Sequence, residues 1–301
     1  MQNSLPEINS FVDDIRAAGF TQALLLGMGG SSMAPEVFRF VIGVKDGFLD
    51  LSVLDSTDAG AVLARENEID IRKTLFIVST KSGGTVETIS FFKYFYQKVK
   101  AYAGENAGEQ FVAITDPGSG LQSVAEQHGF RKIFLNNPNI GGRFSALSFF
   151  GLVPAALIGV DLDEFLHKTV LMAEQCRGRE GNTGVWLGVV MGELAKSGCD
   201  KVTLVTTKTL QPLGAWVEQL VAESSGKENR GILPVTTEPI GKPEVYAQDR
   251  LFVYLNLVED PSLDEEIDAL VAAGHPVVQF NIQDVYEIGA EFFRWAIATA
   301  I

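Results

Sequence analysis

Short runs of leucine and β-branched residues alternate along the chain with longer stretches in which apolar residues recur at helical spacing. This alternation is typical of βαβ units that build a parallel sheet. Strands are predicted at residues 23–26, 51–54, 75–78, 111–114 and 132–135. The alternation pauses over residues 161–197, which predict two helices, and restarts with strands at 201–205, 231–235, 251–257 and 276–280. We therefore expect an α/β protein with two domains, residues 1–160 and 161–301.

Four further stretches predict helices: 85–102, 144–159, 212–224 and the segment from about 285 to the end. The first carries five aromatic residues at helical spacing, which we expect in a core or at a subunit interface (Phe91, Phe92, Tyr94, Phe95 and Tyr96). The last helix reaches Ile301 without the glycine, asparagine or basic turn that usually ends a helix. We expect the natural protein to continue beyond this residue, with an ordinary frayed helix end as the alternative.

The composition narrows the class of protein. Of 301 residues, 46% are apolar and 21% charged, which is enough apolar material for sizeable cores. The net charge of −14 disfavours nucleic acid and membrane surfaces as partners. Two cysteines, Cys176 and Cys199, and three scattered histidines lack metal-ligand spacing, so we expect no metal and no cofactor. The acidic N-terminal segment is unlike a signal peptide, and we expect a cytoplasmic protein.

The first candidate site is a glycine turn, G-M-G-G-S at residues 27–31, between a predicted strand and a helix. Glycines let backbone N–H groups approach an anion, and the helix N-terminus adds partial positive charge. A dinucleotide site is an alternative, because Asp55 closes the next strand, but Ser32 stands where that motif needs its third glycine. A tight turn without a ligand is the other alternative.

The second candidate site gathers four hydroxyls, one lysine and two glycines between a strand end and a helix start. It reads S-T-K-S-G-G-T-V-E-T at residues 79–88. This composition suits a phosphate monoester, whereas the order needed for a nucleotide triphosphate loop is absent. An ordinary helix start with Thr85 as N-cap would explain one of the four hydroxyls.

The third candidate site is N-I-G-G-R-F-S at residues 139–145, where Arg143 precedes an apolar stretch. An arginine here could stabilise an enolate-like oxyanion through charge-assisted hydrogen bonds. A solvated surface arginine is the alternative, and only the neighbouring turns favour the functional interpretation.

Together the three turns resemble the glucose-6-phosphate isomerase family, which is built from two sugar-isomerase (SIS) domains. The fourth matching motif is A-E-S-S-G-K at residues 222–227, and all four come in the family's order. The chain is most similar to the isomerase part of transaldolase fusion proteins. The resemblance implies two SIS-type three-layer α/β/α domains with mainly parallel sheets, the first carrying the phosphate-binding turns and the second carrying Glu223.

The resemblance also implies roles for individual residues. It makes Glu223 the base and places Arg143 beside the reacting carbons. The residues that would bind the substrate are Gly30, Ser31, Thr80, Lys81, Ser82, Thr85 and Gln219. From the residue types alone, a carboxylate such as Glu223 can carry a proton between adjacent carbons through a cis-enediolate, and a last-turn glutamate paired with Lys227 is the structural alternative.

Two departures from the family pattern concern catalysis. The family's ring-opening histidine falls near Gly241, where this sequence has no histidine, and the family's late catalytic lysine lies beyond Ile301. His275, at the start of a predicted strand, is a candidate for ring opening, with a structural role as the alternative.

Three functions are consistent with the sequence. The first is an aldose-ketose isomerase of glycolysis and gluconeogenesis that interconverts glucose 6-phosphate and fructose 6-phosphate. The second is a phosphomannose or dual-specificity isomerase, because the motifs do not report the configuration at C2. The third is a non-catalytic sugar-phosphate-binding SIS module. We expect a sugar phosphate as the small-molecule partner, a homodimer, and possible fusion to a transaldolase domain in the natural protein.

Overall fold

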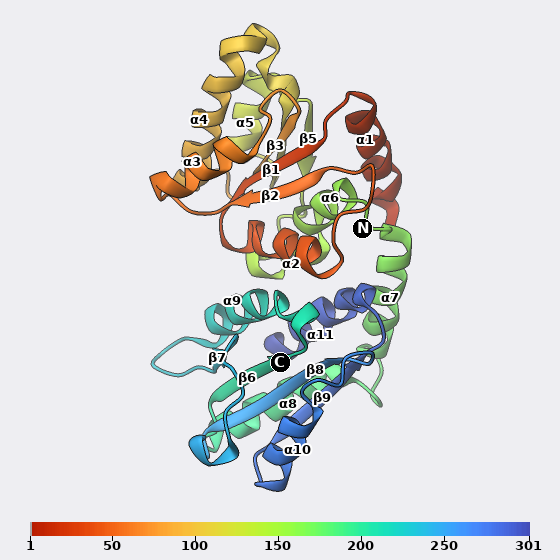
Figure 1. The fold of residues 1–301 in the computed structure, drawn as a ribbon, viewed down its shortest axis with the longest axis vertical. Coiled ribbons are helices and arrows are strands. Elements are labelled where there is room, and N and C mark those ends of the chain that lie inside the picture. The colour runs from red at the N-terminus through yellow and green to blue at the C-terminus, as the bar shows by residue number, and fades with distance from the viewer. Residues whose placement is uncertain (1) are drawn as a thin grey trace. The chain divides into compact units, whose positions relative to one another are not determined.

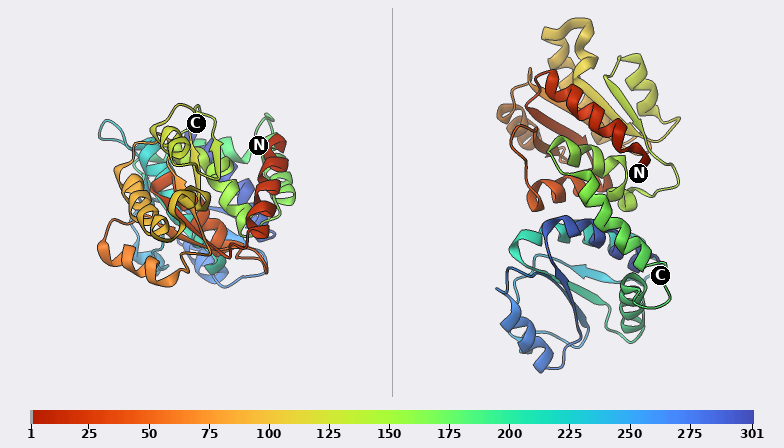
Figure 2. Two further views of the ribbon diagram at one scale, coloured as in Figure 1. Left: turned by 90° about the horizontal axis from the view of Figure 1, so that it is seen from above. Right: turned by 90° about the vertical axis from the view of Figure 1, so that its right-hand side faces the viewer.

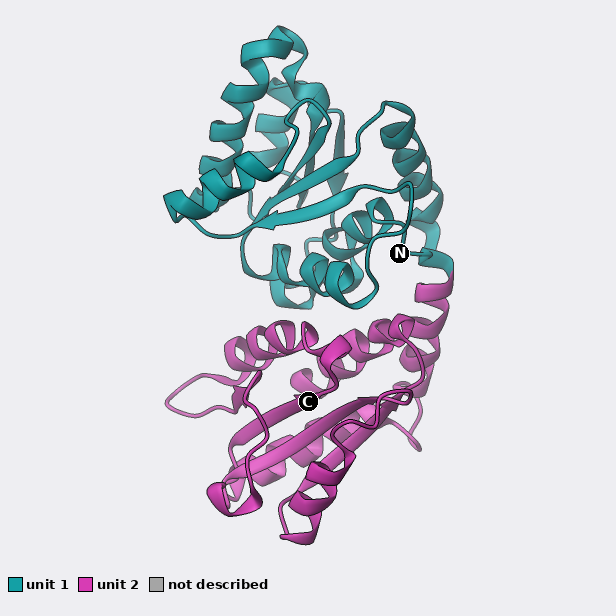
Figure 3. Cartoon of the chain, in the orientation of Figure 1, with its two compact units in different colours: residues 1–163 teal, residues 164–301 magenta. Residues whose placement is uncertain are grey.

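The computed structural model describes residues 2–301, which form two compact units (Figures 1 and 3). Unit 1 extends to Asp163, and unit 2 comprises Glu164–Ile301. Each unit contains its own parallel sheet and its own apolar interior. Among residues 2–301, no helix combines the length and the apolarity needed to cross a bilayer.

Unit 1 is built on a five-stranded parallel sheet in the order β2-β1-β3-β4-β5. Its strands are β1 (Gln22–Gly27), β2 (Asp50–Leu54), β3 (Thr74–Ser79), β4 (Phe111–Thr115) and β5 (Lys132–Leu135). Its helices are α1 (Leu5–Ala17), α2 (Met33–Val41), α3 (Ala59–Glu68), α4 (Val86–Ala103), α5 (Gly120–Gln127) and α6 (Phe149–Leu157). Figure 1 shows α3, α4 and α5 on one face of the sheet and α1, α2 and α6 on the other. The five predicted strands are confirmed to within one residue at each end.

Strand β3 is buried along its whole length, because it lies inside the sheet and helices cover both faces of the sheet. On the α4 face, Phe76 stacks on Phe111 with ring centroids 4.9 Å apart. Phe92 and Phe95 of α4 join the same cluster, and Tyr96 packs against it. The aromatic stretch therefore belongs to the core of unit 1, where burial of each large apolar side chain contributes about 1.5–3 kcal/mol.

The helix predicted over residues 144–159 is wrong at its start. Residues Gly142–Leu147 form a 3₁₀ helix, and α6 begins only at Phe149. Ser148 is extended (φ −115°, ψ −169°), and its hydroxyl accepts a hydrogen bond from the N–H of Phe150. The break occurs because Ser148 is the N-cap of α6 and its hydroxyl satisfies an N–H group at the start of that helix. The apolar pattern of the sequence does not reveal this cap.

Unit 2 is built on a four-stranded parallel sheet in the order β7-β6-β8-β9. Its strands are β6 (Lys201–Thr206), β7 (Leu233–Val235), β8 (Arg250–Leu257) and β9 (Val277–Ile282). The helices that follow α6 are α7 (Leu162–Gln175), α8 (Thr183–Lys196), α9 (Leu213–Ser225), α10 (Asp264–Ala272) and α11 (Ile288–Ala300). The two helices predicted over 161–197 are confirmed as α7 and α8, and the predicted strands agree to within two residues at each end.

Helices cover both faces of the second sheet as well. In the right-hand view of Figure 2, the blue helix α10 and the green helix α8 lie on opposite sides of the strands. Phe252 and Tyr254 pack with α10, whereas Trp216 of α9 meets Phe292 of α11 edge to face at 4.8 Å. The expected α/β architecture with mainly parallel sheets is thereby confirmed in both units.

The two sheets share one feature of topology that determines where ligands can bind. In each, the chain starts at an inner strand, steps to one side, and then crosses to the other side of that first strand. The strand order therefore reverses between β1 and β3 in unit 1, and between β6 and β8 in unit 2. In open parallel sheets, ligands bind outside the carboxyl ends of the strands at such a switch point.

Candidate functional site

Two of the sequence motifs lie on either side of the switch point of the first sheet. Gly27, the last residue of β1, pairs with Ser79, the last residue of β3. The glycine turn after β1 and the hydroxyl-rich turn after β3 therefore start side by side. Ser31 and Thr80 are both largely buried, with 9% and 3% of their surfaces exposed.

The third motif packs directly on the first. A Cβ atom at Gly30 would lie 2.3 Å from the carbonyl oxygen of Gly142, so only glycine permits this approach. Ser145 fixes the contact, because its hydroxyl lies 2.6 Å from Gly142 O and 3.4 Å from Gly30 O. This packing brings Arg143, which is half-buried beside the ring of Phe144, close to the glycine turn.

The hydroxyl-rich turn leaves the start of α4 uncapped by side chains. Thr85 occupies the N-cap position, but its hydroxyl bonds the hydroxyl of Thr80 at 2.9 Å and not the helix backbone. The first N–H groups of this 18-residue helix have no intrahelical acceptor and carry its partial positive charge. The hydroxyl of Thr88, one turn into α4, is buried without a hydrogen-bond partner. The N–H groups at the start of α4 are donors that a phosphate can use.

Gly83 gives the turn its shape. Its φ is +72°, and a Cβ there would lie 2.5 Å from the backbone nitrogen of Leu121 at the start of α5. A side chain at this position would meet both backbone strain and a steric clash. Ser82, the residue before it, is exposed, and its hydroxyl accepts a hydrogen bond from the N–H of Gly84.

Lys81 forms an ion pair with Asp116, which the sequence analysis did not predict. Its ammonium group donates to Oδ2 of Asp116 and, at 3.0 Å, to the carbonyl oxygen of Pro138. Asp116 follows β4 directly, and its Oδ1 is buried without a partner. An acidic residue in the first position after a predicted strand was the available signal. The lysine thus links the turns that follow β3, β4 and β5.

Two of the predicted site residues lie on α9 of unit 2. Gln219 and Glu223 are one helical turn apart, and Nε2 of Gln219 donates a hydrogen bond to Oε1 of Glu223 at 3.0 Å. Glu223 is exposed, whereas Oε1 of Gln219 is buried without a partner. The glutamine therefore orients the carboxylate that the sequence singles out as a base.

His275 has a structural role in unit 2. Only 7% of its surface is exposed, its Nε2 lies 3.1 Å from the carbonyl oxygen of Pro243, and its ring packs edge-on against Tyr246 and Phe252. At Gly241, near which the family's ring-opening histidine falls, the backbone N–H donates a hydrogen bond to the hydroxyl of Tyr246 at 2.6 Å. Across residues 2–301, no group of three or more His, Cys, Asp or Glu side chains is arranged to hold a metal ion.

Comparison with known proteins gives consistent results. A glucose-6-phosphate isomerase of Cyanothece is 36% identical over 219 residues, covering 71% of this chain and 41% of that protein. Its counterpart from Thermus thermophilus is 31% identical over 283 residues, covering 93% of this chain and 64% of that protein. The crystal structure of a glucose-6-phosphate isomerase from Chlamydia trachomatis shares the fold, with a TM-score of 0.83 at 18% identity over 99% of this chain and 68% of that one.

The chain spans between about two fifths and two thirds of the length of these curated relatives. A family model described as phosphoglucose isomerase matches residues 5–252 and so includes all four motifs. On the strength of that match, this chain belongs to the phosphoglucose isomerase family.

Proposed function

We propose that this protein is an aldose-ketose isomerase that interconverts glucose 6-phosphate and fructose 6-phosphate. The observation that carries the proposal is the convergence of three motif turns at the switch point of the first sheet, in a chain of the phosphoglucose isomerase family. Relatives 31–36% identical to this chain bear the name glucose-6-phosphate isomerase, which supports the choice of substrate. A homodimer, a fused transaldolase domain and a cytoplasmic location stay predictions from the sequence.

In this proposal, the turn after β3 holds the phosphate group. Thr80, Ser82 and Thr85 supply hydroxyls, the start of α4 supplies backbone N–H groups, and Lys81 supplies a positive charge. A dianionic phosphate at a helix N-terminus gains both from these hydrogen bonds and from the helix dipole. Gly30 and Ser31 complete the binding surface from the turn after β1.

Glu223 is the proposed base. In the open-chain aldose, its carboxylate removes the proton from C2, the C–H electrons form the C1–C2 double bond, and O1 becomes the enediolate oxygen. The proton on O2 then passes to O1, and protonation at C1 by Glu223 gives the ketose. Arg143 is proposed to stabilise the negative charge of the intermediate, and Gln219 to hold the base in position, as its hydrogen bond to Glu223 suggests.

The test is the substitution Glu223→Gln, which keeps shape but cannot accept a proton. We expect kcat to fall by about two to four orders of magnitude, while glucose 6-phosphate binding by calorimetry stays close to wild type. Glu193→Gln is the matched control, because Glu193 is also exposed near the end of a unit 2 helix. Full activity of Glu223→Gln would exclude this residue as the base.

Two further measurements are isomerisation in heavy water and turnover of mannose 6-phosphate. Conversion of fructose 6-phosphate in heavy water should place deuterium at C2 of the glucose 6-phosphate formed, because the transferred proton resides on an exposed carboxylate.

Mannose 6-phosphate differs from glucose 6-phosphate only at C2. Turnover of mannose 6-phosphate at a comparable rate would identify a dual-specificity isomerase, and binding without any turnover would identify a sugar-phosphate-binding module.

A further inference from the structure

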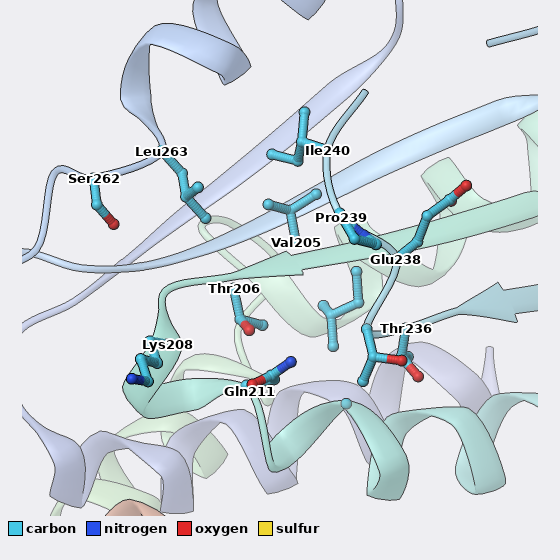
Figure 4. Close-up of a pocket in the computed structure, with 13 residues that line it drawn as sticks. Val205, Thr206, Lys208, Gln211, Thr236, Glu238, Pro239, Ile240, Ser262 and Leu263 are labelled. Carbon is cyan, nitrogen blue, oxygen red and sulfur yellow. The ribbon is translucent and has the colours of Figure 1, made fainter. Parts of the chain in front are cut away.

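Unit 2 contains a cavity that the proposed isomerase function does not use. Figure 4 shows it at the carboxyl ends of β6 and β7, where Thr206, Lys208 and Gln211 face the segment from Thr236 to Ile240. Ser262 and Leu263, from the loop after β8, close a third side. Its volume is about 300 Å³, which is at the lower end of the range for small-molecule sites. Glu223 and Gln219 do not line it.

The cavity lies at the switch point of the second sheet. Its walls come from the ends of β6 and from the loop after β8, the two strands between which the strand order reverses. By sheet order, β6 occupies the position that β1 has in unit 1, and a short 3₁₀ turn and then a helix follow both strands. Parallel sheets bind ligands at this place, so the cavity of unit 2 lies at a position of the same architectural kind.

The residues of the turn after β6 repeat those of the proposed phosphate turn. Residues 205–209 read V-T-T-K-T, and residues 78–82 read V-S-T-K-S. In both, two hydroxyls, a lysine and a third hydroxyl follow the last valine of a parallel strand. Of the hydroxyls after β6, that of Thr206 lines the cavity, whereas that of Thr207 is buried and accepts a hydrogen bond from the N–H of Leu257 at 3.4 Å. Lys208 and Thr206 therefore place a positive charge and a hydroxyl at the cavity, a combination that favours a phosphate monoester.

The polar groups around the cavity have unused hydrogen-bonding capacity. Within residues 2–301, the Lys208 ammonium, the Gln211 amide and the Thr206 hydroxyl make no hydrogen bond or ion pair. Thr237, on the facing wall, has φ +61°, a left-handed conformation that is costly for a β-branched residue. Strained backbone of this kind clusters at ligand sites.

The charges that face the cavity leave room for an anion. Glu238 is the carboxylate among the lining residues, and Nη1 of Arg250 neutralises it at 2.5 Å. Glu218, just outside, accepts a hydrogen bond from the hydroxyl of Thr236 at 2.8 Å. Lys208 is the cation among the lining residues, and it forms no ion pair within the described part of the chain. No second carboxylate or histidine among the lining residues is placed to transfer a proton, so the groups present support binding without chemistry.

We propose that this cavity is a second, non-catalytic binding site for a small phosphate monoester of the hexose phosphate class, with Lys208 on the phosphate and Gln211 and Thr237 on the sugar hydroxyls. Each chain then binds two sugar phosphates, one in each unit.

Amide resonances in ¹H–¹⁵N spectra of the whole chain provide the test, with glucose 6-phosphate as the ligand and Lys81→Ala as the background that weakens the first site. We expect glucose 6-phosphate to shift the resonances of residues 206–211 and 236–240. Adding Lys208→Ala should weaken this binding about 10- to 100-fold, the usual effect of losing a charged hydrogen bond. Adding Lys196→Ala, an exposed lysine of α8, should leave it unchanged.

The outcomes separate this site from the proposed isomerase function. Absence of shifts at these residues, or equal loss in the Lys196→Ala control, would overturn the proposal whatever the activity of the enzyme. Binding of inorganic phosphate as tight as that of glucose 6-phosphate would also overturn it, because the sugar would then contribute nothing. Conversely, loss of isomerase activity in Glu223→Gln with the shifts intact leaves the second site supported.

Discussion

Glu291 on α11 is a carboxyl group enclosed in the interior of unit 2, with 1% of its surface exposed. Its Oε1 accepts a hydrogen bond from Nη1 of Arg294 at 2.5 Å, while its Oε2 has no partner. Arg294 in turn lies over the ring of Phe280 at 3.9 Å. Burial raises the pKa of Glu291 from 4.5 to about 7, and the nearby Arg294 only partly opposes this increase.

This pKa predicts how stability depends on pH. Between pH 4.5 and 7 the native state keeps a proton on Glu291 that the unfolded state releases, so the free energy of unfolding falls as pH rises through this range. The difference between the two pKa values corresponds to about 3 kcal/mol. Glu291→Gln should remove this slope in urea titrations across the range. The exposed Glu265→Gln should keep it, and a wild-type slope in Glu291→Gln would assign the pH dependence to other groups.

Lys81 and Lys208 show which features of a site the sequence does not predict. Lys81 stood out because four hydroxyls surround it in sequence, but its ion-pair partner Asp116 lies 35 positions away and becomes a neighbour only through the pairing of β3 with β4. The same holds for Lys208, whose significance comes from a cavity that three separate segments enclose. Residue type and local spacing identify candidates, whereas partners across strands require the register of the sheet.

At the scale of elements, strands were easier to predict than the helix at residues 144–159. Buried parallel strands such as β3 are apolar at nearly every position, so their limits coincide with the first polar or glycine residues. The stretch from Phe144 onward is equally apolar through both a 3₁₀ turn and α6. Its division depends on the hydroxyls of Ser145 and Ser148, which bond to backbone groups and which a hydrophobic pattern treats as minor interruptions.

The contact between the first and third turns leads to a prediction at this scale. Gly30→Ala would place a methyl group against the backbone of Gly142, and backbone cannot move aside as a flexible side chain can. We expect a loss of about 1–3 kcal/mol in the free energy of unfolding and weaker binding of glucose 6-phosphate. Gly192→Ala, in α8 with no atom near the added methyl, should instead stabilise by up to about 1 kcal/mol. Equal effects of both substitutions on the free energy of unfolding would show that the close contact between Gly30 and Gly142 is not needed for stability.

At the scale of the whole molecule, the two units divide the proposed chemistry. The proposed phosphate-binding turns and Arg143 belong to unit 1, and Glu223 with Gln219 belongs to unit 2. The alternation of strands and helices in the sequence predicted two parallel sheets, because each βαβ unit is a local pattern. The order of strands within each sheet is set by non-local pairing, which no periodicity records.

This division predicts the behaviour of a chain that ends at Asp163. Such a fragment contains the whole five-stranded sheet, its six helices and the aromatic core of unit 1, so it should fold with the helical and strand content of that unit. Because it retains the turns after β1, β3 and β5, it should bind glucose 6-phosphate, with the affinity reduced about tenfold or more by Lys81→Ala. It should show no isomerisation and no deuterium exchange at C2, since Glu223 is outside it. Circular dichroism, calorimetry and NMR of the product sugar measure these three properties, and a folded fragment with isomerase activity would remove Glu223 from the mechanism.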